Sequence, residues 1–197
     1  MQRAALGFRV HSGWAAVVAV TLEKKSLVVL IRRRLQLVKI FSYTFRQPYH
    51  TAEKMPLDEA AAFVRGVEKE SRELAAKGIR GVQKELTILK YKLTGCGLLL
   101  ASGRQLPEFE KILSSHALIH TADGELFRDS LRRAAIRCKL PVTAIKERDL
   151  LSAASKSLRL KPEVLNRRIA ALGKSLGPPW TQDEKFSALA AWLTLVQ

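Results

Sequence analysis

Apolar runs separated by short polar turns fill the first 46 residues, a pattern typical of β-strands joined by hairpins. Gly13 permits a sharp turn after the first run, and Glu23-Lys24-Lys25 forms a polar turn after the second. The pattern therefore predicts a three-stranded antiparallel meander over residues 4–10, 14–22 and 26–32. Apolar and polar residues also alternate over residues 35–41, which predicts an extended third strand or a fourth one.

A helical period follows a predicted loop at residues 47–56, in which Pro56 suits the start of a helix. Gly78 and Gly81 are expected to divide this helical segment into two helices. Apolar residues recur there mostly at intervals of three and four, namely at Leu57, Ala60, Ala61, Val64, Val67, Leu74, Ile79, Val82, Leu86 and Leu89.

The remaining chain alternates predicted strands and helices. A mostly apolar run at residues 93–101 predicts a buried central strand, and residues 141–145 predict a further short one. Thr181 and Glu184 have capping-box spacing at the start of a terminal helix. Helices are also predicted from Pro107 to residue 115 and over residues 126–140, 150–158 and 162–176.

This order predicts an α/β fold whose mixed sheet combines the meander with parallel strands and carries helices on both faces. We expect a single domain over residues 1–197. Its parts are the meander (1–46), a helical segment (57–92), a strand-helix-strand unit (93–146) and C-terminal helices (147–197).

Charge narrows the classes of partner. The formal net charge is +16, with +10 in residues 1–100 and +6 in residues 101–197, so the excess is spread along the chain. A basic folded surface that contacts the phosphate backbone of DNA or RNA is the leading interpretation. Aromatic residues make up only 7% of the chain, which disfavours an extended stacking platform for single strands.

Compartment and redox state are also constrained. Cys96 and Cys138 lack metal-ligand spacing, so we expect reduced core thiols. The N-terminus has no secretory pattern, and the apolar runs are far below membrane-spanning length. A soluble cytoplasmic protein without a membrane partner is expected, and a homodimer stays open.

Four patches resemble the RuvC-type Holliday-junction resolvase branch of the ribonuclease H-like superfamily. The meander followed by alternating helices and strands resembles that superfamily as a whole. The patches are Leu6-Gly-Phe-Arg-Val-His-Ser-Gly-Trp14, Gly97-Leu-Leu-Leu-Ala-Ser102, residues 127–145, and Gln182-Asp-Glu-Lys-Phe-Ser-Ala-Leu-Ala-Ala-Trp-Leu193. The resemblance implies a ribonuclease H-like fold and, where the site is intact, phosphodiester hydrolysis with two divalent metal ions held by several carboxylates.

The carboxylates that this chemistry requires are mostly missing. The first-strand acid of the family falls on Arg9, and the acid at the end of the central strand falls near Ser102 or Gly103. Only Asp183 and Glu184 remain on the last helix, so we expect a degenerate, non-catalytic metal site. Arg9 is predicted to pair with one of these two acids instead.

Basic residues supply the candidates for phosphate binding. Arg32 and Arg34 are expected to share one face of a strand, with Lys39 nearby, and Arg133 and Arg137 to share a face of one helix. The alternatives are a sheet edge protected by charge and an ordinary solvated helix face. Arg167 and Arg168 form a third basic set.

One further cluster offers metal or acid–base chemistry. His116 and His120 are four residues apart, so they can bind one metal ion together if this segment is a helix. Asp123 or Glu125 could complete such a site. The favoured interpretation is that residues 121–124 form a turn and that the two acids cap the next helix.

We therefore predict a nucleic-acid-binding protein with a nuclease-like fold and no cofactor. One alternative is a metal-dependent nuclease with a rearranged centre, in which Asp183, Glu184, Glu125 and His120 are the catalytic candidates. Mg²⁺ or Mn²⁺ would be its cofactor. The other alternative is a structural protein-interaction module whose basic face meets an acidic partner.

Overall fold

The computed structural model describes residues 1–101 and 105–197, and its first strands form the predicted meander. Antiparallel pairing joins β2 to both β1 and β3, and Gly13 makes the first turn with a φ of +81°. The strands are β1 (Gln2–His11), β2 (Trp14–Glu23) and β3 (Ser26–Gln36).

Two parallel strands complete a five-stranded sheet. β4 (Tyr91–Leu100) lies beside β1, and β5 (Val142–Lys146) lies beside β4, which gives the order β3-β2-β1-β4-β5. The predicted mixed sheet is confirmed. Because β1, β4 and β5 run in the same direction, their C-terminal ends meet at one edge of the sheet, where the functional residues of such sheets commonly lie.

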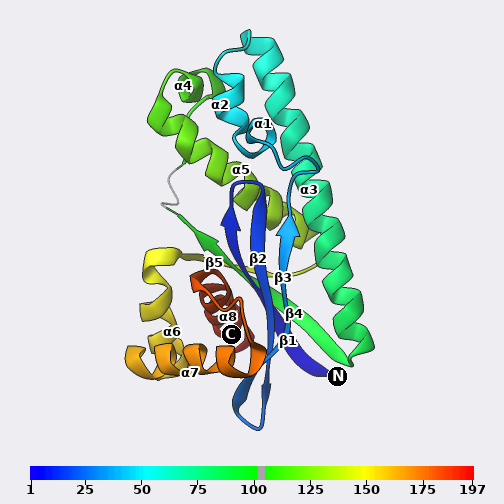
Figure 1. The fold of residues 1–197 in the computed structure, drawn as a ribbon, viewed down its shortest axis with the longest axis vertical. Coiled ribbons are helices and arrows are strands. Elements are labelled where there is room, and N and C mark those ends of the chain that lie inside the picture. Colours follow the sequence, from blue (N-terminus) through cyan, green and yellow to red (C-terminus); the bar gives the residue numbers. More distant parts are fainter. Residues whose placement is uncertain (102–104) are drawn as a thin grey trace.

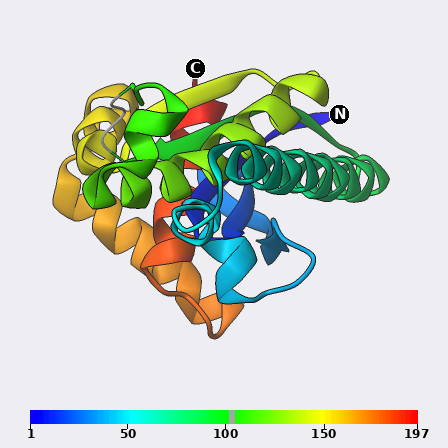
Figure 2. The same cartoon turned by 90° about the horizontal axis from the view of Figure 1, so that it is seen from above.

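Helices cover both faces of the sheet (Figures 1 and 2). α3 (Leu57–Ile88) and α5 (His116–Arg137) pack on one face, against a core that includes Leu6 and Phe8 of β1. α8 (Gln182–Leu195) packs on the other face, with α6 (Leu150–Leu158) and α7 (Pro162–Leu176) beside it, in a core that includes Ala5. None of the described helices is long and apolar enough to span a bilayer.

The backbone of α8 lies directly on β1 and β4. A Cβ atom at Gly7 would lie 1.8 Å from the carbonyl oxygen of Ser187, and one at Gly97 would lie 2.6 Å from that of Ala190. The absence of a side chain at these two strand positions therefore permits the contact. It also fixes the N-terminal end of α8 beside the C-terminal end of β1.

The long helix α3 corrects the prediction of two helices. Gly78 and Gly81 both lie inside one continuous helix. A Cβ at Gly78 would lie 2.0 Å from a Leu35 methyl carbon, so this glycine serves the packing of α3 on β3. Tertiary packing thus outweighs the low helix propensity of glycine here.

The segment after β3 also differs from the prediction. β3 ends at Gln36, and no strand covers residues 37–41; Leu37 and Val38 are buried instead. The Leu37 amide donates a 2.9 Å hydrogen bond to the Gly13 carbonyl, which draws the chain over the first hairpin. The predicted loop over residues 47–56 contains a short helix, α2 (Pro48–Ala52), which follows another short helix, α1 (Tyr43–Arg46).

α5 begins ten residues before the helix predicted at residues 126–140, so the predicted turn at residues 121–124 is wrong. Ile119, Ala122 and Asp123 are buried in its first turns, and this burial holds Gly124 in a helical conformation. The other helices match their predictions closely: α4 (Phe109–Leu113), α6, α7 and α8, with the Thr181–Glu184 capping box formed.

Replacing Gly7 with alanine should lower the free energy of unfolding by about 1–3 kcal/mol, because backbone atoms of α8 must move to admit the methyl group. The matched control is Gly66→Ala, at an exposed site on α3 with nothing within 4 Å of the new atom. This control should raise stability by about 0.5–1 kcal/mol. Urea denaturation measures both, and a neutral Gly7→Ala would contradict the packing of α8 described here.

Candidate functional site

Arg9 occupies the C-terminal end of β1 and joins three elements of the fold. Its Nε and Nη2 atoms donate to the two carboxylate oxygens of Glu147, at 3.0 and 2.8 Å. Its Nη1 donates to Oδ1 of Asp183 at 2.5 Å. Glu147 directly follows β5, and Asp183 lies in the first turn of α8. The guanidinium thus holds Glu147 through the bidentate geometry that makes arginine–carboxylate pairs strong, and it holds Asp183 through a single charged hydrogen bond.

The predicted ion pair between Arg9 and Asp183 is confirmed. Glu184 does not take part, because its carboxylate accepts from the Thr181 backbone N–H and hydroxyl, each at 2.7 Å. Sequence reasoning missed Glu147. Its signal was its place immediately after a strand that runs parallel to the centre of the sheet, where side chains of neighbouring strands converge.

His11 is a second partner of Asp183 that the sequence did not predict. Its Nε2 lies 2.8 Å from Asp183 Oδ1, and its ring stacks on Trp14 with the centroids 4.3 Å apart. Burial raises the pKa of the Asp183 carboxyl, but hydrogen bonds from His11 and Arg9 lower it, and the net result is a pKa below the usual value. The Glu147 hydrogen bond is the largest cause of the raised pKa of Arg9. The lowered pKa of Asp183 and the raised pKa of Arg9 both favour the charged forms of this pair at neutral pH.

A ladder of arginines and aromatic rings continues from His11 across the surface. The Arg34 guanidinium lies over Trp14 at 4.0 Å and over Phe41 at 4.7 Å, both measured to the ring centroid. Arg46 lies over Phe41 at 4.4 Å. Phe41 is 43% exposed despite these contacts. We call Trp14, Arg34, Phe41 and Arg46 the arginine–aromatic ladder; Arg34 and Phe41 are its exposed members, and Arg46 is half-buried.

Arg32 and Arg34, the predicted pair on β3, make different contacts. The Arg32 guanidinium donates to backbone carbonyls at the C-terminal end of α7, including those of Gly177 at 2.8 Å and Pro179 at 2.5 Å. It thereby stabilises carbonyls that the helix leaves unpaired. Lys39 is likewise held, with its Nζ 3.1 Å from Glu70 Oε2 on α3. The Arg32 contacts join β3 to the end of α7, whereas the Lys39 side chain is 68% exposed and its ion pair lies on the surface.

Arg133 and Arg137 line a basic groove of about 650 Å³ between α3 and α5. Asp129 accepts hydrogen bonds from Arg133 and from Arg132, the latter at 2.6 Å, and its net pKa is lowered because these bonds outweigh the opposing effect of burial. The groove is lined by Lys69, Arg72, Glu73, Arg132, Arg133, Ala134, Ile136 and Arg137. The structure thus adds two cations of α3 to the predicted pair on α5.

A larger cavity of about 950 Å³ lies beside Glu147 and between α6, α7 and α8. Its walls are mainly apolar and include Leu99, Ile169 and Leu189. Its charged lining residues besides Glu147 are Arg128, Arg148 and Lys185. A mainly apolar lining of this kind suits an apolar ligand better than it suits a polyanion.

The catalytic candidates of the nuclease alternative fall into separate groups of contacts. Asp183 belongs to the Arg9 cluster, whereas the Nε2 of His120 lies 3.0 Å from the Nε2 of His116. Glu125 pairs with Arg128 at 3.0 Å. The first turns of α5, which carry His120, lie at the opposite end of the molecule from α7 (Figure 1). Ser102, the other degenerate position, lies outside the described residues.

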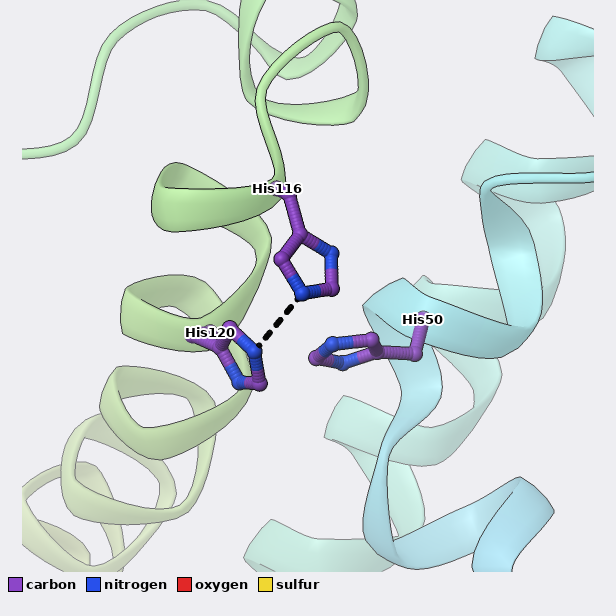
Figure 3. A group of neighbouring side chains, drawn as sticks. All are labelled: His50, His116 and His120. Atoms are coloured by element: carbon purple, nitrogen blue, oxygen red, sulfur yellow. Dashed lines mark hydrogen bonds between the residues drawn. The ribbon is translucent and has the colours of Figure 1, made fainter.

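Asp123 does not cap a helix, as the sequence had suggested. It is buried on α5 and accepts from the Tyr49 backbone N–H at 2.7 Å, with the Nδ1 of His50 2.5 Å from its other oxygen. Burial raises the pKa of Asp123, although the bonds from His50 and Tyr49 oppose this rise. His50 was missed because it is distant from α5 in the sequence. Its ring meets those of His116 and His120 (Figure 3).

Comparisons with known proteins show the fold. No protein-family model and no curated protein matches this sequence. The Thermus thermophilus RuvC structure aligns with a TM-score of 0.50 and 9% identity, over 98% of this chain and 93% of that one. The same protein in complex with a Holliday junction substrate aligns with a TM-score of 0.49 and 8% identity, over the same shares. A Ppx/GppA phosphatase from Aquifex aeolicus aligns with a TM-score of 0.40 and 13% identity. This alignment covers 82% of this chain and 42% of that one.

The chain therefore has the RuvC-type, ribonuclease H-like fold that the sequence predicted. Because the sequence identity to the RuvC structure is low, this structural similarity shows the fold and not the function. The roles of individual residues have to come from the contacts of this chain.

Replacing Arg9 with methionine should lower the free energy of unfolding at pH 7 by about 1.5–3 kcal/mol, because two partly buried carboxylates lose a charged partner. The folded-state pKa of Asp183 is depressed, so its contribution is present above the unfolded value of about 3.9 and is lost as the pH falls through the folded value. The difference between the two proteins should therefore shrink in acid.

Urea denaturation at low salt and at a series of pH values measures this effect, because urea does not screen the ion pairs. Arg33→Met is the control, because Arg33 pairs with Glu85 on an exposed surface and its loss should cost less than about 1 kcal/mol. A loss in Arg9→Met that stays the same from neutral to acidic pH would show that the ion pairs contribute no net stability.

Proposed function

We propose that this protein binds nucleic acid through its phosphate backbone and does not cleave it, with a RuvC-type fold whose metal centre has been replaced by an ion-pair cluster. The observation that carries the proposal is the position of Arg9. Its guanidinium contacts both carboxylates that converge on the edge of the sheet, Glu147 and Asp183.

The charge of this cluster argues against two-metal hydrolysis. Two divalent cations held close together need several carboxylate oxygens, and here two carboxylates already neutralise a fixed positive charge. A metal ion that approached Asp183 would face the guanidinium of Arg9 and the ring of His11. The third position that the resemblance assigns to an acid falls on Ser102, which carries no charge.

The basic groove between α3 and α5 is the proposed phosphate-binding surface. Five cations line it against one carboxylate in its lining, Glu73. A concave surface of this charge suits a polyanion better than it suits a neutral partner. The net charge of +16 agrees with this assignment, because it favours long-range attraction to nucleic acid.

The arginine–aromatic ladder supplies a second contact region. Arg34 and Arg46 both place a guanidinium over the exposed Phe41 ring, an arrangement that suits a phosphate next to an unstacked base. Branched DNA offers both features. A Holliday junction is therefore the first probe to use, since one solved RuvC structure holds such a substrate.

Replacing Arg133 and Arg137 together with glutamine should weaken junction binding and reduce the slope of log affinity against log salt by about two. Fluorescence anisotropy over a range of salt concentrations measures both quantities. The matched control is the Arg167→Gln/Arg168→Gln variant, which removes the same charge from exposed positions on α7. Equal weakening in the control would place the effect in net charge and contradict the groove as the interface.

Incubation of labelled junctions with the protein and Mg²⁺ or Mn²⁺ should yield no cleavage product, because Arg9 occupies the acidic cluster. Gel electrophoresis under denaturing conditions detects nicks directly. Metal-dependent cleavage that Asp183→Asn abolishes would overturn the proposal in favour of a nuclease with a rearranged centre. Failure to bind DNA or RNA even at low salt would leave an interaction module with an acidic protein partner.

A further inference from the structure

Three of the four histidines of this chain converge at one place, away from the Arg9 cluster. His50 comes from α2, and His116 and His120 come from the first two turns of α5 (Figure 3). Each offers one ring nitrogen, and the three nitrogens lie within 4.8 Å of one another. Neutral imidazole nitrogens in such a group are preferred ligands of zinc and related transition metals.

The geometry of α5 explains why two of the three histidines lie together. His116 and His120 are four residues apart on α5, so their side chains lie on one face, one turn apart. Their Nε2 atoms are 3.0 Å apart and their ring centroids 4.5 Å apart. Two nitrogens bound to one tetrahedral zinc at about 2.0–2.1 Å would be about 3.4 Å apart, so only small rotations separate the observed pair from a ligand pair.

His50 brings the third imidazole and a buried carboxylate that orients it. Its Nδ1 lies 2.5 Å from Oδ2 of Asp123, whose side chain is 2% exposed. This contact leaves Nε2 of His50 as the nitrogen available to a ligand. Its ring centroid lies 4.4 Å from that of His120 and 5.2 Å from that of His116. A carboxylate behind a ligating histidine is the usual support of histidine metal sites.

The buried charge of Asp123 also favours a cation at the histidine cluster. Asp123 is almost fully buried, and among the described residues its ion-pair partner is His50 alone. A divalent cation on the far side of the His50 ring would add positive charge close to this buried carboxylate. His116 and His120 are exposed, so an ion could reach the site from solvent.

We propose that His50, His116 and His120 form a three-histidine site for a zinc-type transition metal ion, with Asp123 as the residue that positions His50. Three protein ligands leave a fourth tetrahedral position open to water or to an external ligand. The bound metal also ties α2 to α5, two elements whose contact otherwise rests on the Asp123 hydrogen bonds and local packing. This inference does not depend on the proposed binding of nucleic acid.

Titration of the full-length protein with Co²⁺, followed by visible absorption, tests the site. One ion per chain should bind with the intense d–d bands of tetrahedral coordination, and Zn²⁺ should displace it. His50→Ala, His116→Ala and His120→Ala should each weaken binding at least tenfold. His11→Ala is the matched control, because His11 is the remaining histidine and lies in the Arg9 cluster; it should bind as the wild type does.

Asp123→Asn should retain the absorption bands but bind about 10–100-fold more weakly, as expected for loss of an orienting carboxylate. Circular dichroism of each apo variant checks that it is folded, and the two exposed positions, His116 and His120, keep the test valid if His50→Ala or Asp123→Asn unfolds. Unchanged affinity in folded His50→Ala would show a two-ligand helix site and overturn the proposal. Wild-type protein that binds no Co²⁺ or Zn²⁺ would do the same.

Discussion

The direct contact between the α8 backbone and the centre of the sheet is the constraint on which the rest of the structure depends. Gly7 and Gly97 leave no side chain between β1, β4 and the helix, so α8 lies closer than a Cβ atom would permit. The first turn of α8 is thereby placed beside the end of β1. Asp183 and Arg9 meet because of this packing, although 174 positions separate them in the chain.

The Arg9 cluster determines how the carboxylates at this edge of the sheet are neutralised. In a two-metal centre, mobile divalent cations neutralise converging carboxylates and can activate water. Here a covalently attached guanidinium neutralises them, with bidentate hydrogen bonds to Glu147 and a further bond to Asp183. Arginine stays protonated at any physiological pH and offers no exchangeable coordination position. Arg9 thus joins β1 to the residue that follows β5 and to the first turn of α8, and under the proposed function this joint takes the place of a metal centre.

Local patterns were sufficient to predict most of the fold. Strand alternation, the Thr181 capping box and the apolar run of β4 are encoded within short stretches, and each was predicted from the sequence. The pairing of Arg9 with Asp183 followed from the resemblance to a known fold. What failed was set by contacts between distant segments. Gly78 remains helical because it packs on Leu35, and the start of α5 is helical because Ile119 and Ala122 are buried.

The candidate sites follow the same rule. Glu147 and His11 joined the Arg9 cluster, and His50 joined the two histidines of α5, through contacts that span from 66 to 172 positions in the chain. The sequence pattern identified Arg32 only as a candidate phosphate ligand. Its contacts with carbonyls after α7 were not predicted, because these carbonyls lie well over a hundred residues away in the chain. Residue types show which chemistry a chain can perform, but only the fold shows which residues come together in one site.

Manganese titration followed by NMR of the side-chain carboxyl carbons tests the central claim most directly. Mn²⁺ broadens the resonances of carboxylates that bind it. If Arg9 has replaced the metal centre, the signals of Asp183 and Glu147 should broaden no more than those of exposed acids such as Glu163. Selective broadening of Asp183 and Glu147 at low Mn²⁺ concentration would show that a metal centre survives beside Arg9 and would contradict this account.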